Sequence, residues 1–425
     1  MDKQANSYIQ QNYKWNFSVN ALNEAFWVLS NNLASIITLM PVFIKKLGAS
    51  NTVIGFIPGI AFVCIMMPGI ISANHVENKP NKLAFVKKIT LFERVPFVVL
   101  ALAALFLAES HPTLTIWLSV LCVIFIFGTS GIIQPAWLGY VAKVTPPRKL
   151  GTYFATGNGL GALLGIGGFA FAAYLLSKYP FPYNYFWIFL AASVAVFISY
   201  WTTLLGREPD VFEKKEKTPT LVFFKELPSI LKNDKSFRNF IIVRNLQFLG
   251  SMATTFFTVY AIQNLHFQDS SAAIFSIFFA ASQSVFFFVW GYIGDHKSHK
   301  FVLTVASLGL IATSVLLLLF NSWVSICLVF VSLGIYFSGV GTSGLALLHQ
   351  MAPPGRYPTY IALYNSLQVF CAFLAPVLGG WISDVYGWRN MFWVSLFFSL
   401  SGLLWLQFFV YEKRKQYGSK NLVSE

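Results

Sequence analysis

Residues 146–160 read PPRKLGTYFATGNGL, and residues 353–367 read PPGRYPTYIALYNSL. The two segments align at a fixed offset of 207 residues, and seven of the fifteen positions are identical, including Tyr153/Tyr360 and Asn158/Asn365. A shared composition of loop and helix residues does not place seven identities in register, so the chain contains an internal repeat. The sequence therefore predicts a fold built from two similar halves.

The composition excludes a water-soluble globule. Of the 425 residues, 56% are hydrophobic, 11% are charged and 44 are Phe, whereas roughly a quarter of the residues in an ordinary soluble domain are charged. A net charge of +14 would favour nucleic acid as the partner of a soluble protein, but this chain has too little polar surface to cover a soluble protein of its size. We therefore expect a lipid bilayer as its surroundings and no nucleic-acid partner.

Twelve apolar stretches are long enough to cross a bilayer as helices, for which about 20 residues are needed. Membrane-spanning strands alternate apolar and polar residues, whereas these stretches are continuously apolar. The predicted fold class is an all-α membrane protein with twelve transmembrane helices in two pseudo-symmetric six-helix bundles. The predicted spans are 18–43, 52–74, 89–108, 114–141, 150–177, 184–205, 237–262, 271–294, 301–320, 323–350, 358–384 and 390–411.

A long polar connection follows the sixth span and divides the chain. We expect an N-terminal half over residues 1–205, a cytoplasmic linker over 206–236 with an amphipathic helix around 221–231, and a C-terminal half over 237–425 that ends in a short cytoplasmic tail. Most of the 30 Lys and Arg residues, Arg94 among them, fall in or beside one set of alternate connections. Because short cytoplasmic loops collect Lys and Arg, we expect a multi-pass protein of the cell membrane with both termini in the cytoplasm.

A loop motif and two helix motifs resemble the major facilitator superfamily, and the resemblance covers essentially the whole chain. The loop GYIGDHKSHK after the eighth span is similar to the family's loop signature at Gly291, Asp295 and Lys300. The equivalent loop after the second span departs from it, with Ser72 and Val76 where Gly and Asp are usual. We expect Gly291 to permit close helix packing and Asp295 to cap a helix or pair with a basic residue.

The helix motifs lie in the fifth and eleventh spans. Residues 375–393, APVLGGWISDVYGWRNMFW, are similar to the eleventh helix and following loop of many members of the superfamily. Residues 157–168, GNGLGALLGIGG, resemble the glycine-rich signature of proton-coupled exporters, although Ile166 replaces the usual Pro and the fourth span lacks the Arg that these exporters carry. The resemblance implies a secondary transporter that moves a small-molecule substrate by rocking its two halves about a central site.

Two charged residues stand out within the predicted spans, where charges are costly unless paired or hydrated. Glu24 in the first span and Arg244 in the seventh become equivalent when the following loops are aligned at an offset of 220. Because the first and seventh helices face each other in this superfamily, the resemblance implies a Glu24–Arg244 ion pair that forms or breaks during transport, with Glu24 able to take a proton when unpaired. The alternative is that both side chains reach the cytoplasmic interface and anchor their helices.

Amide and aromatic side chains supply the rest of the predicted substrate cavity. An amide in hydrocarbon must bond to a ligand, to water or to a neighbouring helix, so a packing role is equally open for each one. Few charges among several amides and aromatic rings favour a neutral or weakly charged solute that is amphiphilic or sugar-like. The candidate residues are Glu24, Trp27, Asn31, Gln134, Trp137, Asn158, Arg244, Gln247, Tyr364, Asn365 and Gln368.

Neither a cofactor nor a metal is expected. The four cysteines fall in apolar runs without metal-ligand spacing, and no phosphate-binding loop for ATP occurs. We therefore predict a monomeric secondary transporter rather than an enzyme, with protons as one candidate coupling ion. Uncoupled uptake of a sugar-like nutrient and a nontransporting membrane sensor on the same fold are the alternatives.

Overall fold

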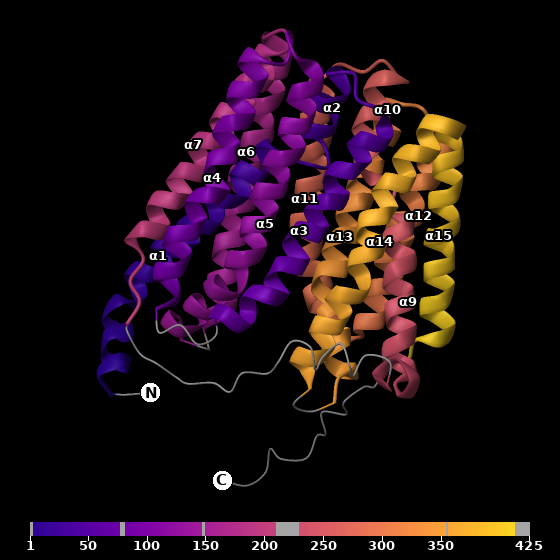
Figure 1. The fold of residues 1–425 in the computed structure, drawn as a ribbon. Helices are drawn as coiled ribbons and strands as arrows, with labels where there is room; N and C mark the ends of the chain where they lie inside the picture. Colours follow the sequence, from indigo (N-terminus) through magenta and orange to yellow (C-terminus); the bar gives the residue numbers. More distant parts are fainter. Residues whose placement is uncertain (1–2, 77–80, 147–148, 210–228, 354–355, 413–425) are drawn as a thin grey trace.

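The computed structural model describes residues 3–76, 81–146, 149–209, 229–353 and 356–412, and within these ranges the chain is helical and contains no strand. Figure 1 shows long helices packed side by side into one bundle. They are α1 (Lys3–Leu33), α2 (Leu39–Lys46), α3 (Asn51–Val76), α4 (Lys82–Phe106), α5 (Pro112–Val144), α6 (Leu150–Lys178), α7 (Tyr183–Leu205), α9 (Lys235–Gly250), η2 (Thr254–Phe256), α10 (Phe257–Gln263), α11 (Ser270–His296), α12 (His299–Leu319), α13 (Trp323–Met351), α14 (Tyr357–Tyr386) and α15 (Trp388–Phe409).

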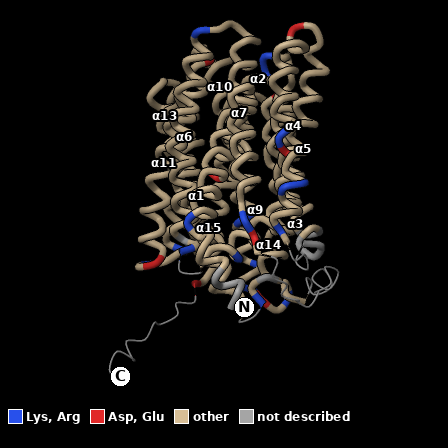
Figure 2. The backbone as a smooth tube through the Cα atoms, turned by 90° about the vertical axis from the view of Figure 1, so that its left-hand side faces the viewer, with Lys and Arg blue, Asp and Glu red and all other residues tan. Residues whose placement is uncertain are grey.

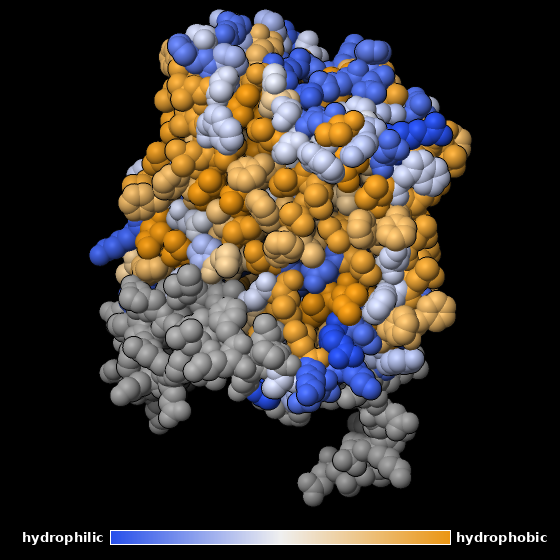
Figure 3. All heavy atoms as spheres, turned by 45° about the vertical axis from the view of Figure 1, so that its right-hand side comes forward, coloured by the Kyte–Doolittle hydropathy of each residue, from blue (hydrophilic) through white to orange (hydrophobic). Residues whose placement is uncertain are grey.

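The twelve predicted spans are present. Among the described residues, eleven segments are long and apolar enough to cross a membrane, and the twelfth is the more polar combination of α1 and α2, which runs the length of the bundle (Figure 1). Charged residues gather mostly towards the two ends of the helices (Figure 2). Hydrophobic side chains cover the middle of the face shown in Figure 3. The chain is a multi-pass membrane protein.

Two of the spans are interrupted at equivalent positions in the repeats. Residues 34–38 separate α1 from α2, and a turn followed by η2 separates α9 from α10. In the first break the hydroxyl of Ser35 accepts the backbone N–H of Thr38 at 3.2 Å, which satisfies a donor that the helix has released. Across the halves, the hydroxyl of Thr258 donates to the carbonyl oxygen of Thr38 at 3.2 Å, at the offset of 220. The two breaks therefore meet between the halves.

Six spans form each half. In the N-terminal half, α1 packs against α6 and α7, and α4 packs against α5 and α7, whereas the main contacts between the halves are α3 with α14 and α6 with α11. The backbones of α3 and α14 come close because Gly55 has no side chain, since a Cβ placed there would lie 2.0 Å from the carbonyl oxygen of Pro376. Small residues at helix crossings are typical of membrane bundles.

The two ends of the bundle differ. We call the side on which α1 begins and α15 ends the terminal face, and the opposite side, which carries α2 and α10, the distal face (Figure 1). At the distal face Lys46 pairs with Asp269 at 2.5 Å. Asp384 also accepts the N–H groups of Asn51 and Thr52, at 2.9 and 2.8 Å, at the start of α3, where a helix has unpaired donors and a positive dipole end. Both contacts join the halves and close the distal face.

The repeated tyrosines make equivalent contacts near the terminal face. The Tyr153 hydroxyl donates to the carbonyl oxygen of Asn20 in α1 at 3.5 Å, and the Tyr360 hydroxyl donates to the Asp234 carboxylate at the start of α9 at 2.9 Å. The predicted linker and its amphipathic helix fall mostly on residues 210–228, outside the described part of the chain.

The loop motif after α11 is built differently from the expectation. A Cβ at Gly291 would meet nothing within 4 Å, whereas one at Gly294 would lie 2.7 Å from Nδ1 of His299, so close packing depends on Gly294. Asp295 is exposed and has no hydrogen-bond or ion-pair partner among the described residues.

The start of α12 is held by two other groups. The Ser298 hydroxyl accepts the N–H of Phe301 at 3.0 Å. The carboxylate of Glu412 accepts the N–H groups of His299 and Lys300, at 3.0 and 3.4 Å. Because Glu412 follows α15, it ties that end of the chain to α12. The capping role expected of Asp295 therefore belongs to Ser298 and Glu412.

Candidate functional site

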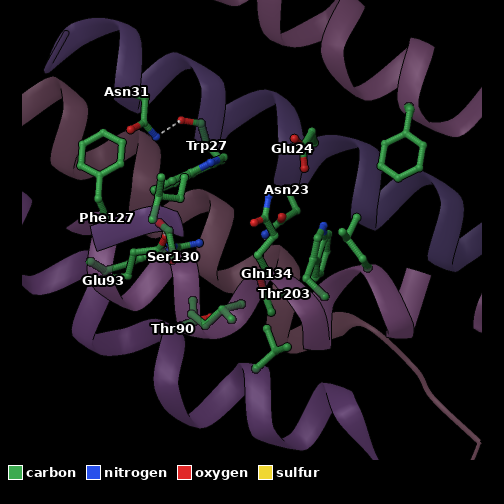
Figure 4. Close-up of a pocket in the computed structure, with 17 residues that line it drawn as sticks. Asn23, Glu24, Trp27, Asn31, Thr90, Glu93, Phe127, Ser130, Gln134 and Thr203 are labelled. Atoms are coloured by element: carbon green, nitrogen blue, oxygen red, sulfur yellow. Dashed lines mark hydrogen bonds and ion pairs between the residues drawn. The ribbon is translucent and has the colours of Figure 1, made fainter. Parts of the chain in front are cut away.

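A cavity of about 490 Å³ lies inside the N-terminal half. Side chains from α1, α3, α4, α5, α6 and α7 form its wall, and the cavity is open on one side, where Gln134 and Leu138 are exposed (Figure 4). Its lining combines aromatic rings, amides, hydroxyls and three charged groups. The lining residues are Asn23, Glu24, Trp27, Asn31, Ile65, Val86, Thr90, Glu93, Arg94, Phe127, Ser130, Ile133, Gln134, Trp137, Leu138, Phe154 and Thr203.

Five of the predicted site residues line this cavity, namely Glu24, Trp27, Asn31, Gln134 and Trp137. The amide of Asn31 donates to the carbonyl oxygen of Trp27 at 2.9 Å, one helical turn earlier, and so stays within α1 (Figure 4). Glu24 has no hydrogen-bond or ion-pair partner in the described part of the chain. Its carboxylate is therefore a candidate for interaction with a proton or with a solute.

Glu24 packs closely against a glycine of α6. Gly157 of α6 lies against Glu24, and a Cβ at Gly157 would come within 3.0 Å of the Glu24 Cβ and 3.2 Å of its Cγ. The glycine lets α6 approach α1 at the level of the carboxylate. Phe154, one turn before Gly157, is the residue of α6 that lines the cavity.

An ion pair inside the bundle was not foreseen. Glu93 and Arg94, on α4, are each 4% exposed and form an ion pair with each other. The Glu93 carboxylate also accepts from the Ser130 hydroxyl of α5, and Arg94 donates from Nη2 to the Ser199 hydroxyl of α7 at 3.2 Å. The Arg94 guanidinium lies 5.0 Å from the centroid of the Trp27 ring on α1, a cation–π distance. The pair thus contacts three neighbouring helices.

The structure corrects the predicted placement of Arg94 beside a cytoplasmic loop. The third span was expected to begin at residue 89, which put both charges near its end. Because α4 begins at Lys82, Arg94 lies about 18 Å along the helix at 1.5 Å per residue. Glu24 is consequently not the only deep carboxylate. Two adjacent opposite charges within an apolar run are the signal that would have indicated this pair.

The C-terminal candidates form a second cluster away from the cavity. Arg244 is buried on α9. Its Nε donates to the Tyr364 hydroxyl at 3.0 Å, and its Nη1 donates to the Gln247 amide oxygen at 2.5 Å. Gln247 in turn donates to the Ser307 hydroxyl of α12 at 2.8 Å, and Gln368 donates to the carbonyl oxygen of Tyr364 at 2.9 Å. These bonds join α9, α12 and α14 and leave Arg244 satisfied by neutral partners.

The implied Glu24–Arg244 ion pair is not formed in this structure. Each residue instead lies against the fifth helix of its own half, Glu24 against Gly157 and Arg244 against Tyr364. Gly157 and Tyr364 are themselves equivalent at the offset of 207. The repeats therefore share one arrangement, but a glycine packs against the charged residue in the first half, whereas a tyrosine hydroxyl bonds to it in the second.

The repeated asparagines lie outside the cavity. Asn158 is exposed, and its amide donates to the carbonyl oxygen of Phe154 at 2.9 Å. Asn365 is half-buried and makes no hydrogen bond within the described ranges. Within those ranges there is also no group of three or more His, Cys, Asp or Glu residues placed to hold a metal. The cavity is therefore a polar and aromatic site among the helices of a membrane protein.

Comparison with known proteins agrees with this description. The family model described as Major Facilitator Superfamily matches residues 240–424. The multidrug resistance protein MdtG of Dickeya zeae is 29% identical over 157 residues, a match that spans 36% of this chain and only 37% of that relative. A mutant of the nucleoside transporter NupG superposes with a TM-score of 0.75 at 13% identity, over 93% of this chain and 99% of NupG. The inward-open xylose transporter XylE of E. coli gives 0.71 at 12% identity, over 95% and 98% of the two chains. Residues 240–424 thus match the Major Facilitator Superfamily model, and the chain as a whole shares the fold of NupG and XylE.

Proposed function

We propose that this protein is a secondary transporter of the cell membrane that moves a small organic solute by alternating access. The observation that carries the proposal is the cavity of about 490 Å³ within the N-terminal half, lined by side chains of six helices. Cavities of this size are typical of sites for small molecules. The match of residues 240–424 to the Major Facilitator Superfamily model supports the same function.

The contacts between the halves favour a state of the transport cycle in which the halves are joined at the distal face. Three contacts join the halves towards the distal face. Lys46 pairs with Asp269, Asp384 accepts the N–H of Asn51 at the start of α3, and Thr258 donates to Thr38 at the first helix break. If the termini are cytoplasmic, as the Lys and Arg distribution predicts, this state is closed to the outside. Transport then requires these contacts to break as the halves rock.

The lining favours an amphiphilic organic solute. Trp27, Phe127 and Trp137 offer aromatic surface, while Asn31 and Gln134 offer amides. The charges of Glu93 and Arg94 cancel, so Glu24 supplies the uncompensated charge when it is ionised. A neutral or cationic solute therefore fits better than an anion. MdtG is named for multidrug resistance and XylE for xylose, and both solute classes are compatible with such a lining.

Glu24 is the proposed site of proton coupling. Its carboxylate lines the cavity without a basic partner among the described residues, so it can exchange a proton with the cavity and change its attraction for a solute. Uncoupled uptake of a sugar-like solute through the same amides is the second candidate function.

A flux measurement tests the proposal. A thermal-shift screen of nutrients and drugs identifies a stabilising solute, whose flux is then measured in proteoliposomes with and without an imposed pH gradient. Proton coupling predicts gradient-driven flux that Glu24→Gln abolishes and that Glu109→Gln, at an exposed position after α4, leaves intact. Flux that ignores the gradient supports uncoupled uptake, and binding without flux supports the sensor.

A further inference from the structure

Two aromatic rings meet between the halves inside the bundle. Phe62 of α3 and Phe248 of α9 lie edge to face with their ring centroids 5.9 Å apart, and both side chains are half-buried. Along α3, Phe62 follows Gly59, where a Cβ would lie 2.7 Å from the carbonyl oxygen of Phe373 on α14. Ile65 comes almost one turn after Phe62 and lines the cavity. Along α3, the ring contact therefore lies between the close packing on α14 and the cavity.

The repeat does not require this contact. At the offset of 220, the equivalents of Phe62 and Phe248 are Ser282 and Val28. The Ser282 hydroxyl donates to a carbonyl oxygen of α13 at 3.0 Å, and Val28 packs against Gly161 of α6. Each of these contacts stays within one half. The two large rings are therefore a feature of this contact between the halves and not of the repeated unit.

Arg244 fixes Phe248 from the side of the C-terminal half. It lies one turn earlier on α9, and its guanidinium carbon is 5.6 Å from the centroid of the Phe248 ring, a cation–π distance. The guanidinium is itself held by the Tyr364 hydroxyl of α14 and by the Gln247 amide. Because Phe62 belongs to the N-terminal half, a movement of the halves can separate the two rings while Arg244 keeps Phe248 in place.

We propose that Phe62 and Phe248 form a gate between the cavity and the distal face, and that Arg244 is a positioning residue for this gate. When the distal face opens, α3 moves away from α9, the ring contact breaks and Phe248 stays against Arg244. The buried charge predicted in the seventh span then serves the conformational change and does not contact the solute. This inference rests on the proposed function, since a gate presupposes alternating access.

Labelling from one side of the membrane measures the gate. In a chain whose four native cysteines are replaced by alanine, Gln134→Cys places a thiol in the cavity. An impermeant maleimide is added to the distal side of oriented proteoliposomes, and the rate of labelling is measured. The gate variants are Phe62→Ala and Phe248→Ala. The control Phe288→Ala removes a ring that is 78% exposed on α11.

We expect Phe62→Ala and Phe248→Ala each to raise the rate of distal labelling by about three- to tenfold, the range that corresponds to the loss of one aromatic pair. The double variant should gain no more than either single variant, because one ring alone makes no contact. Phe288→Ala should be labelled like the parent. The rate of labelling from the terminal face should stay nearly unchanged in all of them, which verifies an intact fold.

Two further variants test the role of Arg244. Arg244→Gln removes the charge, whereas Tyr364→Phe keeps the charge and the ring but removes the acceptor of Nε. Each should raise distal labelling in the parent and leave it unchanged when Phe248→Ala is already present. A residue that only stabilises the fold would change both backgrounds equally. If Arg244→Gln is not monodisperse after purification, Tyr364→Phe decides.

Three results would overturn the inference in different ways. If Phe62→Ala and Phe248→Ala are labelled like the parent while Gly55→Ala, which forces α3 and α14 apart, is labelled faster, alternating access stands without the gate. If Tyr364→Phe raises labelling equally with and without Phe248→Ala, Arg244 does not act through the ring. If no variant, Gly55→Ala included, is labelled from the distal side, alternating access fails and the inference fails with it.

Discussion

Gly157 and Tyr364 occupy the same position in the two repeats and face equivalent charged residues. Gly157 packs closely against Glu24, whose side chain lines the cavity, and the Tyr364 hydroxyl accepts from Arg244 at 3.0 Å. One substitution between the repeats thus accompanies an open polar site in one half and a filled one in the other. The cavity itself lies in the N-terminal half.

Filling the space at Gly157 should therefore remove solute binding. A leucine side chain at this position would enter the region that Glu24 occupies, because even a Cβ would lie 3.0 Å from the Glu24 Cβ. We expect Gly157→Leu to weaken the binding of the best solute from a thermal-shift screen by at least about tenfold, since a filled site loses its contacts. Titration calorimetry in nanodiscs measures this affinity.

Gly159→Leu is the matched control. It lies two residues further along the same helix, where a Cβ would meet nothing within 4 Å. Equal losses of affinity in Gly157→Leu and Gly159→Leu would show that helix stability, and not the space beside Glu24, is responsible.

The close contact of α3 with α14 should control the distal face. A Cβ at Gly55 would lie 2.0 Å from the carbonyl oxygen of Pro376, so Gly55→Ala forces the two helices apart. In a variant whose four native cysteines are replaced by alanine, spin labels at Ser50 and Tyr386 report the distance between the distal ends of these helices. We expect a larger population at long distance in Gly55→Ala. The control Gly167→Ala adds a Cβ that meets nothing within 4 Å and should reproduce the parent distribution.

The Glu93–Arg94 pair should show strong coupling in a double-mutant cycle. Each side chain is 4% exposed, and removing one leaves the other charge buried without its partner. We expect Arg94→Ala and Glu93→Ala each to lower the free energy of unfolding by about 3–5 kcal/mol, and the double variant to lose less than the sum. Unfolding in mixed micelles measures these values. Additive losses would show that the two charges are not coupled.

Hydropathy is sufficient to predict eleven of the spans, because a helix needs a fixed length of apolar sequence to cross a bilayer, whereas the span formed by α1 and α2 is more polar. It does not predict the break at residues 34–38, which contains neither Gly nor Pro and is stabilised by Ser35 and by Thr258 of the other half. The repeat alignment makes Glu24 and Arg244 equivalent. Equivalence does not imply contact, however, because each residue packs within its own bundle.

The cavity residues are predictable only in part. Glu24, Trp27 and Gln134 are conspicuous as polar or aromatic residues within apolar spans and do line the cavity. Arg94 is not conspicuous, because it follows several Lys residues at the start of α4 and resembles an interfacial residue. Its depth depends on where α4 begins, and hydropathy determines the ends of helices poorly.

Side-specific labelling of Gln134→Cys tests alternating access most directly. The residue lines the cavity, and the cysteine-free background allows one impermeant maleimide to report its exposure from either side of oriented proteoliposomes. A protein closed at its distal face should be labelled from the terminal face alone, and Gly55→Ala should add labelling from the distal face. Labelling of the parent protein from the distal face alone, or no change in Gly55→Ala, would contradict a transporter whose halves close at α3 and α14.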